Sequence, residues 1–397
     1  MGYERAVVGQ LELALAREKP LLEVLIGPRQ VGKTTAAEQV AGRLGWPTVF
    51  GSADGPLPPG PEWVETQWQR ARREARRAGG GPVLLVLDEI QKVRGWQEVV
   101  KRLWDEDRRG RVGRLRVLLL GSSSLQLQRG ATESLAGRFF LHRCMHWSLR
   151  ECRDAFGWDL DDWLYFGGYP GAAPFSGRPG EWRRYVTDSL IEAVLSRDVL
   201  QIQTVAKPAL LRHLFMLACA HPAQVLSFNK MLGQLTDAGN TTTLAGYARL
   251  LEAAFLLTAL PAWSGSAVRQ RASSPKWVLW NNALVNATAT RSPEEVAADP
   301  TWRGHLVENA VGAHLVNHLP PLNYSVHYWR QGRDEVDFVV SSGKRLWALE
   351  VKSGRGGRTG GLTAFQRHHP RARALVIGGS GVPVEEFLLA PPTDLLG

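Results

Sequence analysis

Residues 27–34 read Gly-Pro-Arg-Gln-Val-Gly-Lys-Thr, and this spacing of glycines, lysine and threonine is suited to holding phosphate groups. The glycines let backbone N–H groups curl around phosphates, and the N-terminus of a following helix adds partial positive charge. We expect Lys33 to reach the terminal phosphates and the hydroxyl of Thr34 to ligate Mg²⁺. The predicted cofactors are therefore ATP and Mg²⁺. The residues expected to line the nucleotide are Gly27, Pro28, Arg29, Gln30, Val31, Gly32, Lys33, Thr34 and Thr35.

Two adjacent acids follow a second apolar run, residues 83–87. A continuous apolar run is typical of a central parallel strand, and ligands in such sheets bind at the carboxyl ends of the strands. We expect Asp88 to hold Mg²⁺ through water and Glu89 to orient and polarise the attacking water. The alternative is that both acids only begin a surface loop.

A third group of charged residues lies near the C-terminus. Residues 335–340 and 346–352 are predicted strands joined by a two-residue hairpin loop at Gly343 and Lys344. This register places Asp337 opposite Glu350, and Glu350 and Lys352 then project from one face. Two facing carboxylates would attract a divalent metal, and a lysine-stabilised water would attack a phosphodiester. Ordinary surface acids on a hairpin are the alternative.

These residues need a scaffold, and the apolar runs indicate one. Runs at 21–26, 48–50, 83–87 and 117–120 alternate with helical patterns, which predicts a parallel sheet in an α/β domain over residues 1–150. Residues 151–295 are mostly helical. Residues 296–397 begin with a long helix and continue with several strands, as a second α/β unit. We therefore expect three domains with these bounds.

The run at 116–120 ends in Gly121 and three serines, and here the chain resembles the AAA+ superfamily. In that superfamily a polar residue after this strand senses the γ-phosphate, which implies Ser122, with Ser123 next. The resemblance also gives Arg138, in Ser-Leu-Ala-Gly-Arg, the role of a finger supplied to the ATP of a neighbouring subunit, and so implies a homo-oligomer. A plain surface arginine is the alternative.

Nearly the whole chain resembles a bacterial and archaeal ATPase family that joins an AAA domain to a restriction-endonuclease-like domain. The matching motifs include Leu-Asp-Glu-Ile-Gln (87–91), Phe-Gly-Gly-Tyr-Pro (166–170), Glu-Val-Asp-Phe (335–338) and Leu-Glu-Val-Lys (349–352). The resemblance implies a PD-(D/E)xK nuclease core. Its expected site residues are Glu308 on a helix, Asp337 and Glu350 as metal ligands, Lys352, and Gln366 as a further candidate. The residues directly after Pro170 are Gly-Ala-Ala, whereas related initiator-type ATPases often carry a second sensor arginine there, so the sequence departs from the resemblance at this point.

The middle of the chain resembles a winged helix. Helical patterns at 204–217, at 227–235 and from 243 onward are followed by predicted strands at 256–260 and 276–280. The outward positions of the third helix carry few basic residues. Packing and groove reading are therefore both open as its use.

Charge and composition favour a folded protein with an anionic partner. The formal net charge is +10, with 44% hydrophobic and 22% charged residues. DNA is the expected partner. The basic stretch at 69–77 is either a solvated helix face or a DNA-facing surface. The three cysteines show no disulfide pattern, and the sequence shows no signal peptide and no stretch that could span a membrane. These features predict a cytoplasmic protein that is not bound to a membrane.

Together these patterns predict an ATP-dependent enzyme that processes DNA, with a nuclease site whose activity the sequence leaves open. One alternative is a translocase or remodeller whose C-terminal domain grips DNA without cutting it. Another is a nucleotide-controlled switch or scaffold with a protein partner.

Overall fold

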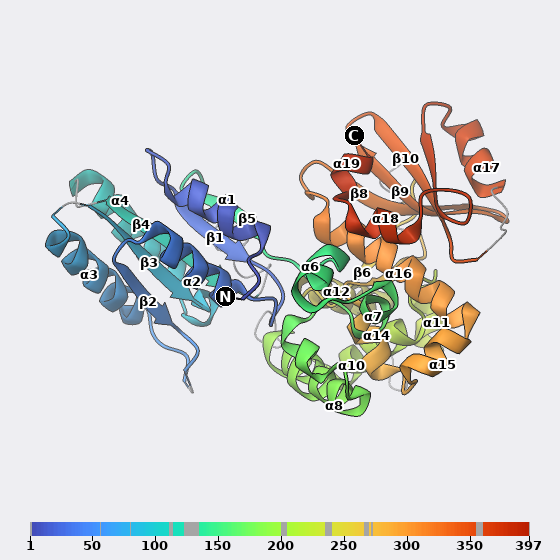
Figure 1. Cartoon of the computed structure of the whole chain (residues 1–397), viewed down its shortest axis with the longest axis horizontal. Helices are drawn as coiled ribbons and strands as arrows, with labels where there is room; N and C mark the ends of the chain where they lie inside the picture. Colours follow the sequence, from blue (N-terminus) through green and yellow to red (C-terminus); the bar gives the residue numbers. More distant parts are fainter. Residues whose placement is uncertain are drawn as a thin grey trace. The chain divides into compact units, whose positions relative to one another are not determined.

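The computed structural model describes residues 2–55, 57–79, 81–110, 114–122, 135–199, 205–234, 240–265, 270, 273–354 and 360–396. The chain divides into two compact units, Met1–Met145 and His146–Gly397. The second unit contains both the helical middle of the chain and its C-terminal strands (Figure 1).

The first unit is built on a five-stranded sheet with the order β2-β3-β4-β1-β5, in which every neighbouring pair is parallel. The α/β class with a parallel sheet is thus confirmed. The strands are β1 (Leu22–Ile26), β2 (Thr48–Ser52), β3 (Pro82–Asp88), β4 (Arg114–Gly121) and β5 (Phe139–Arg143). The helices that accompany them are α1 (Ala6–Leu15), α2 (Lys33–Leu44), α3 (Glu62–Arg77) and α4 (Trp96–Gly110), with the short η1 (Ile90–Lys92) after β3.

Strand β5 has no counterpart among the predicted strands. It lies at the edge of the sheet and pairs with β1, from Leu22 opposite Phe139 to Ile26 opposite Arg143. Its five residues are mostly half-buried or exposed, whereas every residue of β1 is buried. An edge strand of this kind lacks the continuous apolar run by which the central strands were identified.

The second unit begins with helices. These are α6 (Leu149–Phe156), α7 (Leu160–Phe166), η2 (Pro170–Phe175), α8 (Pro179–Arg184), η3 (Tyr185–Ile191) and η4 (Val194–Asp198). Three further helices, α10 (Pro208–Ala220), α11 (Phe228–Leu232) and α12 (Thr241–Ala253), precede an antiparallel pair of strands, β6 (Leu257–Leu260) and β7 (Lys276–Leu279). Helices α14 (Asn282–Thr288) and α15 (Pro293–Ala298) complete this part. The order of three helices and two strands matches the sequence pattern.

The C-terminal part opens with the long helix α16 (Pro300–His318). Strands β8 (Ser325–Gln331), β9 (Asp334–Ser342), β10 (Arg345–Lys352) and β11 (Arg373–Gly378) form a mixed sheet with the order β11-β10-β9-β8. Helix α17 (Gly360–His368) precedes β11, and α18 (Val384–Leu389) and α19 (Pro392–Leu395) follow it. The predicted hairpin is confirmed, because Ser342 pairs with Arg345 and Phe338 with Leu349.

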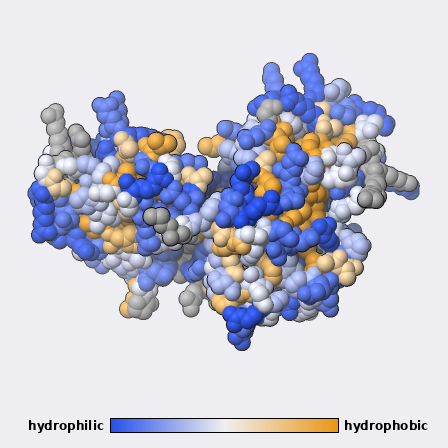
Figure 2. Space-filling model, viewed as in Figure 1, coloured by the Kyte–Doolittle hydropathy of each residue, from blue (hydrophilic) through white to orange (hydrophobic). Residues whose placement is uncertain are grey.

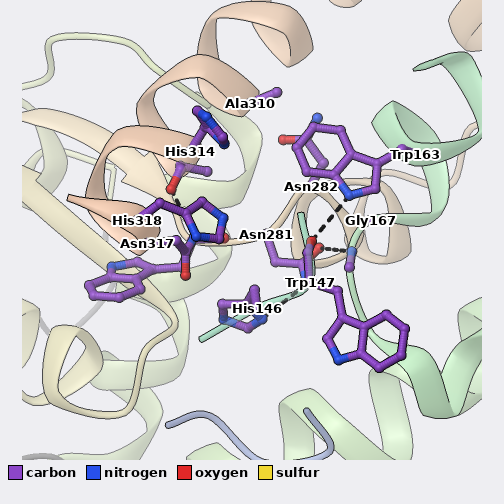
Figure 3. A pocket seen from close by; sticks show the side chains of 13 residues that line it. His146, Trp147, Trp163, Gly167, Asn281, Asn282, Ala310, His314, Asn317 and His318 are labelled. Atoms are coloured by element: carbon purple, nitrogen blue, oxygen red, sulfur yellow. Dashed lines mark hydrogen bonds between the residues drawn. The ribbon is translucent and has the colours of Figure 1, made fainter. Parts of the chain in front are cut away.

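Buried asparagines connect the middle of the chain to α16. The side chain of Asn309 accepts a hydrogen bond from Leu279 N (2.9 Å) and donates one to Leu279 O (3.0 Å). Asn281 Oδ1 accepts from Gly168 N at 3.0 Å, beside a pocket that the two parts share (Figure 3). A Cβ on Gly167 would lie 2.0 Å from that same oxygen, which explains the first glycine of Phe-Gly-Gly-Tyr-Pro.

Among the residues that the structure describes, few large apolar side chains are exposed. The most exposed among the described residues are Leu322, Leu57 and Leu13, which are far apart in the sequence. Hydrophilic residues dominate the visible face of the first unit, with smaller apolar patches between them (Figure 2). Within the described part of the chain, no helix combines the length and apolarity needed to cross a membrane.

Candidate functional site

The phosphate-binding loop connects the end of β1 to the start of α2, as the sequence pattern requires. Its first glycine is needed for close packing, because a Cβ on Gly27 would lie 1.8 Å from the carbonyl oxygen of Cys144. Gly32 precedes α2 with φ of +88°, and Gln30 also has a positive φ, of 59°. Left-handed residues let a loop turn sharply, and this loop ends at the N-terminus of α2, where unpaired backbone N–H groups favour an anion.

Lys33 and Thr34 are the first residues of α2 and are placed at the head of the loop. The Lys33 ammonium donates to Gly27 O (3.0 Å) and Pro28 O (2.6 Å), so it is folded over the loop that would hold phosphates. Burial lowers the pKa of Lys33, while the charges of Glu89 and Asp88 oppose that shift. An ammonium in this setting gains from an anionic ligand.

The two residues predicted to hold Mg²⁺ at the loop are in direct contact. Thr34 Oγ1 donates to Asp88 Oδ2 at 2.8 Å, across the gap between α2 and the end of β3. Burial raises the pKa of Asp88, and the hydrogen bond from Thr34 opposes the rise. A hydroxyl and a carboxylate at this spacing are the hard oxygen ligands that Mg²⁺ prefers, so the residues present fit the ion.

Glu89 follows in a left-handed conformation, with φ of +53°. This is uncommon for a residue other than glycine, and strain of about 1–3 kcal/mol of this kind is found mostly at functional sites. Gln91 Nε2 donates to Glu89 Oε2 at 2.7 Å, and Ser122 Oγ donates to the same oxygen at 3.2 Å. Gln91 also reaches Ser122 Oγ at 3.1 Å. Glu89, Gln91 and Ser122 therefore form one hydrogen-bonded group at the carboxyl ends of β3 and β4.

Two residues of this site have no predicted role in the sequence pattern. Gln91 belongs to the motif Leu-Asp-Glu-Ile-Gln, which supports the resemblance but assigns it no role. Its place two residues after Glu89 in a short turn could have indicated that the two side chains are in contact. Arg5 lies far from the loop in sequence, yet its buried guanidinium donates to Val31 O (3.2 Å) and Met145 O (2.9 Å). It thus connects the loop to the segment after β5, a contact that no local pattern indicates.

Arg138 lies elsewhere. Its carbonyl accepts from the N–H of Leu22, the first residue of β1, whereas the phosphate loop follows the last residue of that strand. Its guanidinium forms a two-pronged ion pair with Asp105, at 2.9 and 3.0 Å. Arg138 and Asp105 line a surface pocket together with Arg108 and Arg109. Ser123 and Ser134 lie outside the described residues.

A second charged cluster lies between α16, β9 and β10. Glu308, on α16, forms an ion pair with the ammonium of Lys276, a residue of β7 that the sequence analysis did not select. The same ammonium donates to Asp337 O at 3.1 Å and lies 3.7 Å from Asp337 Oδ1. Burial alone would lower the pKa of Lys276, but the charges of Glu308 and Asp337 outweigh it and raise that pKa. The only sequence signal for Lys276 is a charge inside an apolar strand.

Glu350 and Lys352 pair with each other in this cluster. Lys352 Nζ donates to Glu350 Oε1 at 2.5 Å, and Asp337 Oδ2 accepts from Val351 N at 2.7 Å. Burial raises the pKa of Glu350, with a further rise from the charge of Asp337. The structure therefore places Asp337 near Glu350 and Lys352, as the hairpin register predicts, and it also places Glu308, which only the resemblance implied, beside Asp337 through their shared partner Lys276. Gln366 instead donates to the carbonyl of Ala372.

Three family models match successive parts of the chain. Residues 19–153 match an AAA domain, residues 157–295 a domain of unknown function (DUF8612), and residues 303–386 a domain of unknown function (DUF4143). Uncharacterised proteins of Mycobacterium tuberculosis and Mycobacterium bovis are each 27% identical to this chain over 357 residues, which is 88% of this chain and 73% of theirs.

Solved structures with partial similarity include the ORC1 protein of Aeropyrum pernix in complex with DNA. It is 16% identical, with 75% of this chain and 94% of that chain covered and a TM-score of 0.32. The RuvB Holliday junction branch migration motor of Thermotoga maritima is 16% identical, with 65% and 90% covered and a TM-score of 0.35. Similarity at this level carries no conclusion. The family match and the parallel sheet with its phosphate loop together show that residues 19–153 form an AAA domain.

Proposed function

We propose that this chain is an ATP-dependent DNA-processing enzyme that hydrolyses ATP in its first unit. The observation that carries the proposal is the contact between Thr34 and Asp88 at 2.8 Å, with Lys33 on the loop and Glu89 at the end of the same strand as Asp88. The AAA domain match supports it. Nothing else in the described chain gathers a phosphate loop, two metal ligands and a base.

Each residue has a part in the proposed hydrolysis. The loop N–H groups and Lys33 bind the phosphates, and Lys33 exchanges the carbonyls of Gly27 and Pro28 for phosphate oxygens. Thr34 and Asp88 would hold Mg²⁺, which when bound would supply positive charge to offset the negative charge on the phosphate oxygens. Glu89 orients and polarises the attacking water, and Gln91 and Ser122 fix the direction of its carboxylate.

DNA is the proposed partner, because the chain carries a net charge of +10. Helix α3 contributes a basic C-terminal half on the first unit. In the second unit, α10 to β7 follow the order of a winged helix, and α16 to β11 follow the order of a PD-(D/E)xK core. We propose these as DNA-contacting domains in a three-domain chain, and a homo-oligomer in which Arg138 completes a neighbouring ATP site.

The proposal is tested by measuring ATP hydrolysis with single-stranded, duplex and four-way-junction DNA over a range of salt concentrations. We expect stimulation by at least one DNA, lost in Lys33→Ala. DNA binding by both proteins should weaken as salt rises, with a log–log slope of about −0.9 for each phosphate contact on duplex DNA. If no DNA binds or stimulates at low salt with nucleotide present, the proposal fails, and a nucleotide-controlled switch with a protein partner takes its place.

A second candidate is favoured by Lys276. A translocase or remodeller that grips DNA without cutting would use the same ATP site, and would need no divalent metal among Glu308, Asp337 and Glu350. The ion pairs of Lys276 with Glu308 and Asp337 favour this form of the proposal.

A further inference from the structure

The cluster in the C-terminal part already holds a cation of its own chain. Lys276 is fully buried at the start of β7, a strand that continues with Trp277, Val278 and Leu279. Its ammonium contacts the Glu308 carboxylate and lies 3.7 Å from that of Asp337, with the carbonyl of Asp337 as a further acceptor. The ring of Phe338 lies 4.8 Å away.

A buried ammonium is unfavourable unless it is paired and hydrogen-bonded. Here the two carboxylate partners, Glu308 and Asp337, are residues that the resemblance assigns to the nuclease site, and Asp337 is one of its expected metal ligands. The charges also nearly balance. The carboxylates of Glu308, Asp337 and Glu350 face the ammonium groups of Lys276 and Lys352, and Glu335, whose charge also acts on Lys276, lies 3.8 Å from the guanidinium of Arg330. A divalent cation would add two further positive charges to a cluster that needs one at most.

The remaining oxygen atoms are not arranged for a metal either. Mg²⁺ and Ca²⁺ require several oxygen ligands at about 2.0–2.6 Å. Asp337 Oδ2 accepts the N–H of Val351, and Glu350 Oε1 accepts from Lys352. Glu350 Oε2 is buried without a hydrogen-bond partner and is open to a cation, but it is a single oxygen atom. Across the part of the chain that the structure describes, no three acid, histidine or cysteine side chains are grouped so as to hold a metal ion. The residues present therefore do not fit the divalent cation expected at Asp337 and Glu350.

We propose that the Lys276 ammonium takes the place of the metal ion in this nuclease-like domain. The domain then binds no divalent cation at Glu308, Asp337 and Glu350, and it does not cleave DNA by a metal-activated water. Lys276 comes from the middle of the chain, so it also ties that part to the C-terminal sheet. The inference does not rest on the proposed ATP hydrolysis, because all of its residues lie in the second unit.

The test uses Mn²⁺ alone as the probe, with the full chain and without nucleotide. All proteins carry Asp88→Asn, so that the phosphate-loop site loses one metal ligand. Mn²⁺ binding is measured by electron paramagnetic resonance, and thermal unfolding is recorded with and without the ion. We compare four proteins: the parent, Lys276→Ala, Asp337→Asn and Lys344→Ala. The last is the control, because Lys344 lies in the exposed hairpin loop.

We expect the parent and Lys344→Ala to bind no Mn²⁺ in the second unit. Lys276→Ala should unfold at a lower temperature than the parent and should gain one Mn²⁺ site. Adding Mn²⁺ should raise its unfolding temperature by several degrees. The double variant Lys276→Ala, Asp337→Asn should show neither the Mn²⁺ site nor this rise. Mn²⁺ binding by the parent that Asp337→Asn abolishes would overturn the proposal. A folded Lys276→Ala that binds no Mn²⁺ would overturn it as well. If Lys276→Ala does not fold, Lys276→Met replaces it, and the parent and Asp337→Asn still decide.

Discussion

At the scale of single residues, the ATP site separates binding from chemistry. Lys33 and Thr34 belong to the loop and to α2, where phosphates and Mg²⁺ would lie. Glu89, Gln91 and Ser122 belong to the ends of β3 and β4, and they are bonded to one another rather than to the loop. Substitutions of Lys33 or Thr34 should therefore change nucleotide affinity, whereas substitutions of Glu89, Gln91 or Ser122 should change the rate of hydrolysis.

The first prediction compares Lys33→Ala with Glu89→Gln. Removing the lysine deletes a charged hydrogen bond worth about 1.5–3 kcal/mol, so ATP should bind roughly 10- to 100-fold more weakly. Glu89→Gln keeps the size and most hydrogen bonds of the side chain but loses the base, so ATP should bind normally while turnover falls. Nucleotide affinity and single-turnover hydrolysis are the measurements, with Glu74→Gln on α3 as the control. Parental hydrolysis by Glu89→Gln would remove Glu89 from the mechanism.

Gln91 gives the second prediction. Gln91→Leu removes the amide that holds Glu89 Oε2 at 2.7 Å, and a misdirected carboxylate positions the water poorly. We expect kcat to fall roughly 10- to 100-fold with little change in nucleotide affinity, because the amide lies outside the phosphate loop. Gln69→Leu, on an exposed position of α3, serves as the control. An equal loss of affinity and kcat would instead point to general damage of the domain.

At the scale of elements, the sequence predicts well what is local. The central strands β1, β3 and β4 are predicted from their continuous apolar runs. The Gly343–Lys344 loop predicts the hairpin register that places Asp337 near Glu350. The edge strand β5 is not predicted, because its side chains are mostly half-buried and so form no continuous apolar run. Lys276 and Arg5 escape for another reason. Lys276 contacts Glu308 and Asp337, and Asp337 lies 61 residues away in sequence, while the nearest of the partners named for Arg5 lies 26 residues away. No local period encodes contacts of that range.

The connection between β7 and α16 gives the third prediction. The buried side chain of Asn309 accepts a hydrogen bond from the N–H of the buried Leu279 and donates one to its carbonyl oxygen. Asn309→Leu keeps the volume but deprives three buried polar groups of this partner, namely the N–H and carbonyl of Leu279 and Oδ1 of Asn282, at about 1–3 kcal/mol each. Urea unfolding followed by tryptophan fluorescence should show that the free energy of unfolding falls by about 3 kcal/mol or more. Asn323→Leu, on an exposed turn, should change stability little, and equal losses in both variants would refute the role of Asn309.

At the scale of the whole molecule, we propose that a neighbouring copy completes the ATP site. Arg138 lies at the start of β5, beside the first residue of β1, and the phosphate loop follows the last. Five residues of strand separate these two edges by about 16 Å. An arginine finger at this position therefore serves a neighbouring copy or none. Its ion pair with Asp105 holds the guanidinium at that edge, beside Arg108 and Arg109.

The last prediction follows from this geometry. If Arg138 acts on the ATP of a neighbour, specific ATPase activity should rise with protein concentration, and Arg138→Ala should be nearly inactive while still binding ATP. Mixing Arg138→Ala with Lys33→Ala should restore part of the activity, because each chain supplies what the other lacks. Asp105→Asn removes the ion pair but keeps the finger, so it should remain active and separates a catalytic role of Arg138 from a structural one. Arg77→Ala, at the exposed end of α3, is the matched arginine control. A monomer whose turnover is independent of concentration, with no recovery on mixing, would show that Arg138 is a surface arginine paired with Asp105.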